Sequence, residues 1–198
     1  RDFALDFRGK VVLDVGASTG GYTDCALQNG AARVIALDVG YGQLDWGLRN
    51  DSRIKVMERT NIRYLTPDLL GESVDIITMD VSFISTTLIY PVLSKLLKED
   101  GEVVALIKPQ FEAGRDKVGK NGVVRDPVIH GEVLQRCINA AQEAGLNCTG
   151  ICFSPLKGPK GNIEYFIYLR TVPKPMQQTD EIIEETVQKA HRFWEGNK

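Results

Sequence analysis

Apolar residues are concentrated in seven short runs along the chain, separated by polar or glycine-rich segments. The runs cover residues 10–15, 33–38, 54–58, 74–80, 101–108, 147–153 and 163–171. Most of them are nearly continuous in valine, isoleucine and leucine, without the alternation of a half-exposed strand. This is typical of strands that are covered on both faces in a mostly parallel sheet.

Segments with apolar residues at helical spacing lie between these runs. They predict helices over residues 22–29, 43–49, 86–98 and 127–144, and over 179–194 with Thr179 as the capping residue. The loop between the last two runs is too short for a right-handed helical crossover, so the last strand should be antiparallel. The pattern predicts an α/β Rossmann-like fold, with a mostly parallel seven-stranded sheet, a reversed last strand and helices on both faces. We expect one domain over 1–172, followed by a linker and an appended helix over 173–198.

The composition of the chain excludes several classes of protein. The net charge of −2 over 198 residues excludes binding to nucleic acid by overall charge, although a local basic surface stays possible. No run approaches the roughly 20 apolar residues of a membrane span, and there is no signal-peptide pattern. The four cysteines contain no C-x-x-C pair and there are two histidines, so we expect no metal site, reduced cysteines and a cytosolic location.

Polar residues stand where the apolar runs end. They are Asp14, Asp38, Asp80 and Lys108, and Glu164 stands at the start of the reversed run. The carboxyl ends of parallel strands share one edge of the sheet, which is where open α/β sheets bind ligands. Pro109 favours this placement of Lys108, because a residue before proline is pushed to the extended region. We expect these side chains to converge.

The glycine-rich loop after the first run indicates which ligand binds. A dinucleotide fingerprint would need glycine at positions 16, 18 and 21, but position 18 is serine. An acid 22 residues after Gly16 fits an S-adenosylmethionine turn instead, in which Asp38 takes both ribose hydroxyls and Asn61 meets the adenine. The predicted cofactor-binding residues are Asp14, Gly16, Ala17, Ser18, Gly20, Gly21, Asp38, Val39, Asn61 and Asp80, with Gly16 and Gly20 allowing the backbone to approach the ligand. An NAD-dependent oxidoreductase remains the alternative.

Several longer strings carry a family resemblance. GASTGGYTDC, ALDVGYGQL, ERTNIR, MDVSFIS, LIKPQFEAGR, GVVRDP and SPLKGPKGNIEY resemble the TlyA (hemolysin A) family of ribosomal RNA methyltransferases, whose catalytic domain is similar to the FtsJ ribose methyltransferases. The resemblance covers roughly residues 9–170. It implies a class I methyltransferase fold, S-adenosylmethionine as cofactor, and 2′-O-methylation of ribosomal RNA at cytidine.

The resemblance also implies a Lys-Asp-Lys-Glu catalytic tetrad. Asp80, Lys108 and Glu164 match its last three members. The first lysine belongs to a Ser-Arg-Gly-Gly-x-Lys segment, which we expect to precede Arg1 in a longer protein, together with an S4-type RNA-binding module. The chain is therefore expected to be a catalytic fragment.

Other reactions fit the residues less well. Cytosine-C5 methylation would need a cysteine nucleophile, typically after proline, and no cysteine here follows proline. Methyltransferases that act on exocyclic amines usually carry a (D/N/S)-P-P-aromatic string after the fourth strand. This chain has Asp-Val-Ser-Phe there, at residues 80–83. A membrane-lytic protein would need a basic amphipathic helix, whereas segment 179–194 begins with acidic residues. Lys108 could accept the proton or stabilise an alkoxide, and which group takes the proton stays open.

A local basic surface is predicted beside the active edge. Residues 108–125 carry five basic and two acidic side chains. The predicted RNA-binding residues are Arg115, Lys117, Lys120, Arg125, Lys157 and Lys160. Phe83 and Phe111 are expected to pack in the core, with stacking on an RNA base as the alternative.

Overall fold

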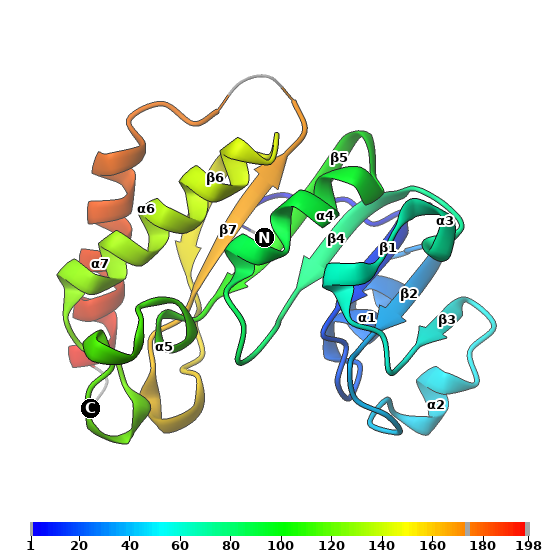
Figure 1. Ribbon diagram of the computed structural model, residues 1–198, viewed down its shortest axis with the longest axis horizontal. Coiled ribbons are helices and arrows are strands. Elements are labelled where there is room, and N and C mark those ends of the chain that lie inside the picture. Colours follow the sequence, from blue (N-terminus) through cyan, green and yellow to red (C-terminus); the bar gives the residue numbers. More distant parts are fainter. Residues whose placement is uncertain (1, 173–174, 197–198) are drawn as a thin grey trace.

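Seven strands form one sheet in the order β3-β2-β1-β4-β5-β7-β6 (Figure 1). The computed structural model describes residues 2–172 and 175–196. The strands are β1 Val11–Val15, β2 Arg33–Leu37, β3 Ile54–Met57, β4 Val74–Met79, β5 Leu97–Ile107, β6 Asn147–Phe153 and β7 Tyr165–Arg170. Only β7 is antiparallel to its neighbours, β5 and β6. The predicted mostly parallel sheet with a reversed last strand is confirmed.

The order of the strands reverses direction at β1, in the middle of the sheet. β1 pairs in parallel with β2 on one side and with β4 on the other, so that Val12 lies opposite both Val34 and Ile76. The carboxyl ends of β1, β2, β4 and β5 therefore share one edge. Because β7 runs the other way, its first residue, Tyr165, lies at this same edge, opposite Ile107.

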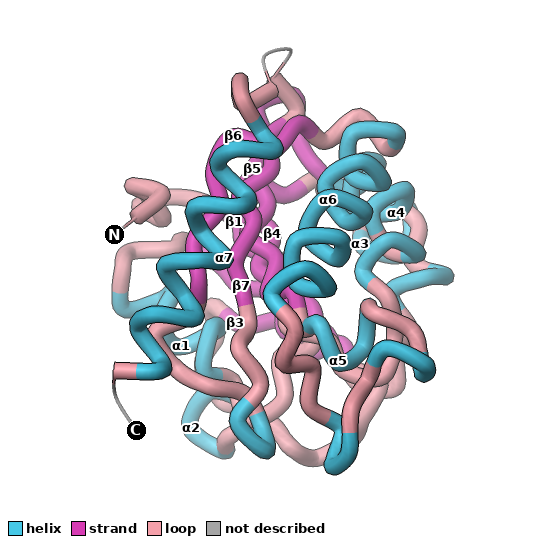
Figure 2. The backbone as a smooth tube through the Cα atoms, turned by 90° about the vertical axis from the view of Figure 1, so that its left-hand side faces the viewer, coloured by secondary structure: helices cyan, strands magenta, loops and turns pink. Residues whose placement is uncertain are grey.

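Helices cover both faces of the sheet. They are α1 Gly21–Gln28, α2 Trp46–Arg49, α3 Pro67–Leu70, α4 Tyr90–Leu96, α5 Pro109–Glu112, α6 Pro127–Glu143 and α7 Thr179–Glu195. In Figure 2, α3, α4 and α6 lie on one side of the sheet and α1 lies on the other. No helix in the described part of the chain is long and apolar enough to cross a lipid bilayer.

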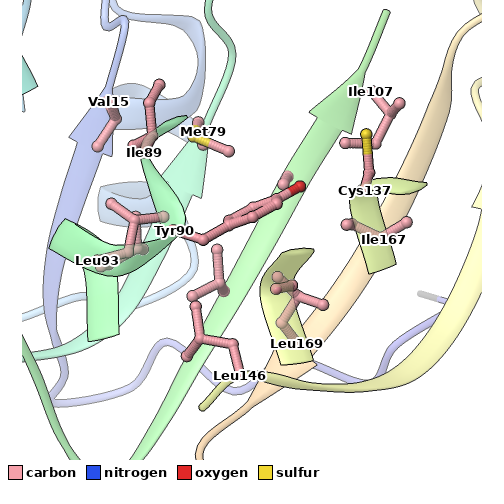
Figure 3. Packing of buried hydrophobic residues seen from close by; sticks show 14 of the residues in the cluster. Val15, Met79, Ile89, Tyr90, Leu93, Ile107, Cys137, Leu146, Ile167 and Leu169 are labelled. Carbon is pink, nitrogen blue, oxygen red and sulfur yellow. The ribbon is translucent and has the colours of Figure 1, made fainter. Parts of the chain in front are cut away.

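Alternating strand residues divide the interior into a larger and a smaller hydrophobic core. Leu13, Ile35 and Ile77 point into the larger one, where the ring of Tyr90 from α4 lies among aliphatic side chains (Figure 3). The neighbouring strand residues face the other way and pack against α1; they are Val12, Val34 and Ile76. Burial on both faces explains why these strands read as continuous apolar runs.

The prediction of a single helix over residues 86–98 is wrong. The chain forms a 3-10 turn at Thr86–Leu88 and then the separate helix α4, which has proline in its first turn. The helix ends at Leu96 because Leu97 is extended and pairs with Val74, so that β5 begins four residues before the expected residue 101. A register shift between Val74 and Ile76 accommodates the charged, exposed residues 98–100.

The start of α2 and the capping residue of α7 also differ from the prediction. α2 begins at Trp46 rather than 43, because Asp45 caps it by accepting hydrogen bonds from the backbone N–H groups of Gly47 and Leu48. Thr179 does not cap α7. Gln178 occupies the cap position, and the Thr179 hydroxyl donates instead to the carbonyl of Met176 at 3.1 Å.

The C-terminal helix packs onto the rest of the molecule. α7 contacts α6 and β6, and its buried Ile183, Val187 and Ala190 are part of the larger core. The predicted linker includes residues 173 and 174, which lie outside the described residues. The division into a domain over 1–172 and an appended segment stays a prediction.

Candidate active site

The loop that follows β1 passes against the end of β4. Gly16 has φ +84°, and a Cβ atom there would lie 2.1 Å from the carbonyl oxygen of Asp80, so only glycine fits. At Gly20, with φ +101°, a Cβ would instead lie 2.3 Å from Leu48 Cδ1. The first glycine thus lets two strand ends approach each other. The second makes room for Leu48 and Leu44, so the expectation that Gly20 serves a ligand finds no support in its contacts.

Asp14 lies beneath this loop and is fully buried. Its two carboxylate oxygens accept hydrogen bonds from the hydroxyls of Thr23, at 2.7 Å, and Thr78, at 2.9 Å. Burial raises the pKa of Asp14, and the two hydroxyls oppose that shift. These bonds join β1 to α1 and β4, which fits a positioning role better than the predicted contact with the cofactor.

Asp38, directly after β2, fixes the conformation of two loops. One of its oxygens accepts from the backbone N–H of Ser18 at 2.8 Å, and the other accepts from Gly40 at 2.7 Å. An ionised carboxylate offers about four acceptor positions, so two remain for a ligand. Asp38 is half-buried and lines the cavity described next.

A cavity of about 760 Å³ lies at the carboxyl edge of the sheet where β1, β2 and β4 end. The predicted cofactor residues Gly16, Ser18, Asp38, Val39, Asn61 and Asp80 line it, whereas Asp14, Ala17, Gly20 and Gly21 do not. The Asn61 side-chain oxygen is already engaged, since it accepts from the backbone N–H of Arg63. Apolar walls come from Leu37, Ile62, Val81 and Ile84.

Lys108 lies beside this cavity and forms an ion pair with Asp80. Its Nζ is 2.5 Å from Asp80 Oδ1 and donates to the hydroxyl of Ser82 at 3.2 Å. The lysine side chain is 12% exposed and the aspartate 35%, so the pair is shielded from water but open on one side. The parallel register of β4 and β5 brings the two strand ends together.

Glu164 immediately precedes β7 at the same edge. Its side chain is buried and accepts a hydrogen bond from Gln110 Nε2 at 2.9 Å. Burial raises the pKa of Glu164, while the Gln110 bond and the charge of Lys108 lower it in part. Gly158 leaves the space that this carboxylate occupies, because a Cβ there would lie 2.1 Å from Glu164 Oε1.

Two phenylalanines that were expected to pack in the core, Phe83 and Phe111, lie next to the catalytic candidates. Phe83 is 91% exposed, has φ +64°, and lies with its ring centroid 4.8 Å from that of Phe111, which is half-buried. The expected core packing is therefore wrong for Phe83. An apolar ring held in a strained backbone conformation at the cavity wall is a candidate contact for a substrate.

The predicted RNA-binding residues are all exposed. Arg115 and Lys120 lie in single 3-10 turns between α5 and α6. Two others have intramolecular partners: Lys117 pairs with Glu132, and Lys157 Nζ lies 4.6 Å from the ring centroid of Trp194. Lys160 lies in the loop before β7, and Arg125 lies two residues before α6.

Sequence reasoning missed several residues of the site. Gln43, Arg63 and Ser82 line the cavity, Gln110 holds Glu164, and Gly158 makes room for it. All five residues stand inside strings that carry the family resemblance, which is a usable signal. The contacts of Gln110 and Gly158 with Glu164 give no local signal, because they depend on how the folded chain surrounds this carboxylate.

The fold and the site together define a class of protein. A solved S-adenosylmethionine dependent methyltransferase from Mesorhizobium loti superposes with a TM-score of 0.61, over 85% of this chain and 94% of that one, at 12% sequence identity. At that identity the likeness concerns the fold alone: this is the Rossmann-like methyltransferase fold, with the cavity at the edge where such folds bind ligands.

The family follows from the sequence comparison. The model of the FtsJ-like methyltransferase family matches residues 1–171, so the chain belongs to this family. It is a methyltransferase, and the methyl donor of the family is S-adenosylmethionine. The resemblance to the TlyA and FtsJ enzymes is confirmed.

Relatives in several bacteria share most of this chain. YqxC of Bacillus subtilis is 49% identical, over 100% of this chain and 72% of its own length. The 16S/23S rRNA (cytidine-2′-O)-methyltransferase TlyA of Mycobacterium tuberculosis is 50% identical over 85% of this chain, which spans 63% of that relative. A solved structure from Streptococcus thermophilus is 45% identical with a TM-score of 0.94, over 98% of this chain and 71% of that one.

Proposed function

We propose that this chain transfers a methyl group to the 2′-hydroxyl of a cytidine ribose in ribosomal RNA, as the catalytic part of a TlyA-like enzyme. The observation that carries this proposal is the Lys108–Asp80 ion pair at the wall of the large cavity, with Glu164 at the same sheet edge. The half-identical TlyA relative, named for cytidine-2′-O methylation, supports the acceptor.

The residues of the cavity fit S-adenosylmethionine. Asp38 keeps free acceptor positions for the two ribose hydroxyls, and the apolar wall at Ile62 suits an adenine ring. Gly16 and Ser18 of the first loop also line the cavity and would hold the methionine part. When bound there, the cofactor supplies an electrophilic methyl group.

The catalytic residues act by positioning the acceptor and managing its proton. A ribose hydroxyl is a weak nucleophile, so holding its oxygen in line with the methyl group supplies much of the rate. Lys108, shielded from water, takes the proton of the hydroxyl as the O–CH3 bond forms and the S–CH3 bond breaks. Asp80 and Ser82 fix the direction of the amino group of Lys108, and Glu164, fixed by Gln110, orients the ribose or the lysine.

RNA is held by surfaces around this site. The exposed ring of Phe83 stacks on the base of the target nucleotide, which must leave its helix for the ribose to reach Lys108. Arg115, Lys120, Arg125 and Lys160, with the more engaged Lys117 and Lys157, contact phosphates. These contacts are local, in keeping with the net charge of −2.

The competing functions have less support. An NAD-dependent oxidoreductase would need a pyrophosphate-binding glycine where Ser18 stands, and the family match is to methyltransferases. A membrane-lytic protein finds no bilayer-crossing helix in the described residues, and α7 buries its apolar face in the core. The cytosolic location stays a prediction, supported by four free cysteines among the described residues.

The test is the chemical position of the new methyl group. The protein is incubated with S-adenosylmethionine and ribosomal subunits that lack the modification, and nucleosides are analysed by mass spectrometry for 2′-O-methylcytidine. Lys108→Ala should lower the rate at least ~10²-fold while cofactor affinity is kept, and Lys108→Arg should not restore it, because a guanidinium stays protonated. Lys95→Ala, an exposed lysine on α4, is the matched control. A base-methylated product, or full activity of the arginine variant, would contradict the proposal.

A further inference from the structure

A second, smaller cavity of about 180 Å³ lies away from the cofactor cavity. Three separate segments form it: the end of the loop before α6, with Arg125; the loop before β7, with Lys157 and Ile163; and the last turns of α7, with His191, Trp194 and Glu195. Figure 1 shows these two loops beside the C-terminal end of α7. Arg125 and Lys157 are among the predicted RNA-binding residues, but the cavity that they share with α7 has no part in the methyl transfer described above.

The cavity presents hydrogen-bond donors that lack acceptors. Trp194 Nε1 is buried and has no hydrogen-bond partner in the described part of the chain, although an indole N–H can only donate. A buried donor left without an acceptor is costly, and such groups are rare in folded proteins. An acceptor from outside the chain would satisfy it.

Two cationic side chains, Lys157 and Arg125, also line this cavity. Lys157 Nζ lies 4.6 Å from the centroid of the Trp194 ring, so the ammonium group is held over the face of the indole. The exposed Arg125 forms no ion pair within the residues that the structure describes. The exposed carboxylate of Glu195 also lines the cavity, which leaves an excess of one positive charge before any contribution from His191.

We infer that this cavity binds a phosphate group of the substrate RNA strand next to the methylated nucleotide. The inference rests on the proposed function and extends it. A guanidinium, an ammonium and an N–H group converge, and phosphate oxygens accept from all three. The cavity is also coupled to the catalytic edge, because Ile163 immediately precedes Glu164, and Gly158, next to Lys157, packs against the Glu164 carboxylate.

The position defines a path for the RNA. A strand whose ribose lies at Lys108 and Glu164 would run along the loop before β7 and place a neighbouring phosphate beside Trp194. This phosphate would fix the register of the strand without reading its sequence. α7 would then contribute directly to RNA binding through its last turns.

Trp194 itself provides the probe. The chain has two tryptophans, Trp46 and Trp194, so a ¹⁵N-labelled sample gives two indole N–H signals, and Trp194→Phe identifies them. The protein is titrated with octacytidylate and, separately, with inorganic phosphate. We expect octacytidylate to shift the Trp194 signal at a concentration at least tenfold below that needed for phosphate. An equal response to inorganic phosphate would make this a site for free phosphate and overturn the inference, as would the absence of any shift.

Charge variants supply the second measurement. Arg125→Gln and Lys157→Gln should each weaken octacytidylate binding by about tenfold and reduce the slope of log affinity against log salt by about 0.7, the value for one lost phosphate contact on a single strand. Lys95→Gln carries the same charge change on α4 and should alter neither. Equal effects of all three variants would show a general charge effect and overturn the site.

The two proposals fail separately. If RNA shifts the Trp194 signal but 2′-O-methylcytidine never forms, the reaction is wrong and the phosphate site stands. If methyl transfer proceeds with an unchanged KM for RNA in both glutamine variants and without a shift of the Trp194 signal, the phosphate site is wrong and the reaction stands.

Discussion

At the scale of single residues, Asp38 both holds two loops in place and lines the cavity. Its carboxylate closes two loops by accepting from Ser18 and Gly40, and its remaining acceptor positions face the cavity. A substitution at Asp38 therefore removes a ligand contact and loosens the loops at the same time. Two substitutions are needed to separate these effects.

Asp38→Ala should weaken S-adenosylmethionine binding by about 2–3 kcal/mol, or ~30–150-fold, because two charge-assisted hydrogen bonds to ribose hydroxyls are lost. Asp38→Asn keeps the shape and one acceptor oxygen, so its loss should be smaller. Isothermal titration calorimetry measures both affinities, and thermal melting reports the loops. Binding of the alanine variant within threefold of the parent would show that Asp38 is not the ribose ligand.

At the scale of elements, the loop before β7 sets the position of Glu164. Gly158 has an extended backbone, with φ −69°, so alanine there is not strained by its own conformation. Its Cβ would nevertheless lie 2.1 Å from Glu164 Oε1, and the carboxylate would have to leave Gln110. The glycine is thus required by a contact between two elements rather than by a turn.

Gly158→Ala should lower the rate of methyl transfer at saturating substrates by about tenfold or more, while S-adenosylmethionine affinity stays within twofold. The free energy of unfolding should fall by about 1.5–3 kcal/mol, the contribution of one hydrogen bond to a charged group. Gly131→Ala, where a Cβ would make an ordinary 3.9 Å contact with Ile183, is the matched control. An unchanged kcat in the Gly158 variant would mean that the position of Glu164 is not important for turnover.

At the scale of the whole molecule, one buried histidine joins three distant parts of the chain. His130 of α6 lies 3.0 Å from the carbonyl of Val124 through Nε2, and 2.8 Å from the Tyr165 hydroxyl through Nδ1. His191 of α7 approaches the same Nδ1 at 3.1 Å. A carbonyl only accepts, so Nε2 carries the proton and Nδ1 accepts in the neutral ring. Protonation would remove that acceptor.

Burial lowers the pKa of His130 from 6.5 to about 4, and the charge of His191 adds to this shift. The unfolded chain therefore binds a proton more readily than the folded one, so stability is fully present above pH 6.5 and is lost as the pH falls towards 4. Between pH 7.5 and 5, His130 alone should lower the free energy of unfolding by about 2 kcal/mol. Urea denaturation at several pH values measures it.

The control for this prediction is His130→Gln, which retains a side-chain donor but does not titrate. The difference between the two stability curves isolates His130, since all other groups are common to both proteins. The curves should converge as the pH falls from 7.5 to 5. Parallel curves over this interval would show that His130 does not carry the pH dependence.

Part of the site could be predicted because it depends on local pattern and on one geometric rule. Strands covered on both faces read as nearly continuous apolar runs, so the seven runs identified the strands. Parallel strands bring Asp38, Asp80 and Lys108 to a common edge. The same reasoning placed Asp14 and Gly20 among the ligand contacts. In the structure Asp14 contacts Thr78 and Gly20 makes room for Leu48, and no local pattern encodes the approach of these segments.

The sequence by itself determined the order of the strands, the reversed last strand and the residues at the strand ends, because each follows from spacing along the chain. It also indicated the family, through strings that resemble it. Tertiary structure decided which of these residues line the cavity. It buried Asp14, exposed Phe83, fixed Glu164 between Gln110 and Gly158, and brought Arg125, Lys157 and Trp194 around one cavity. Contacts between segments so far apart arise only when whole elements pack, since burial and hydrogen bonding then act on side chains that share no sequence neighbourhood.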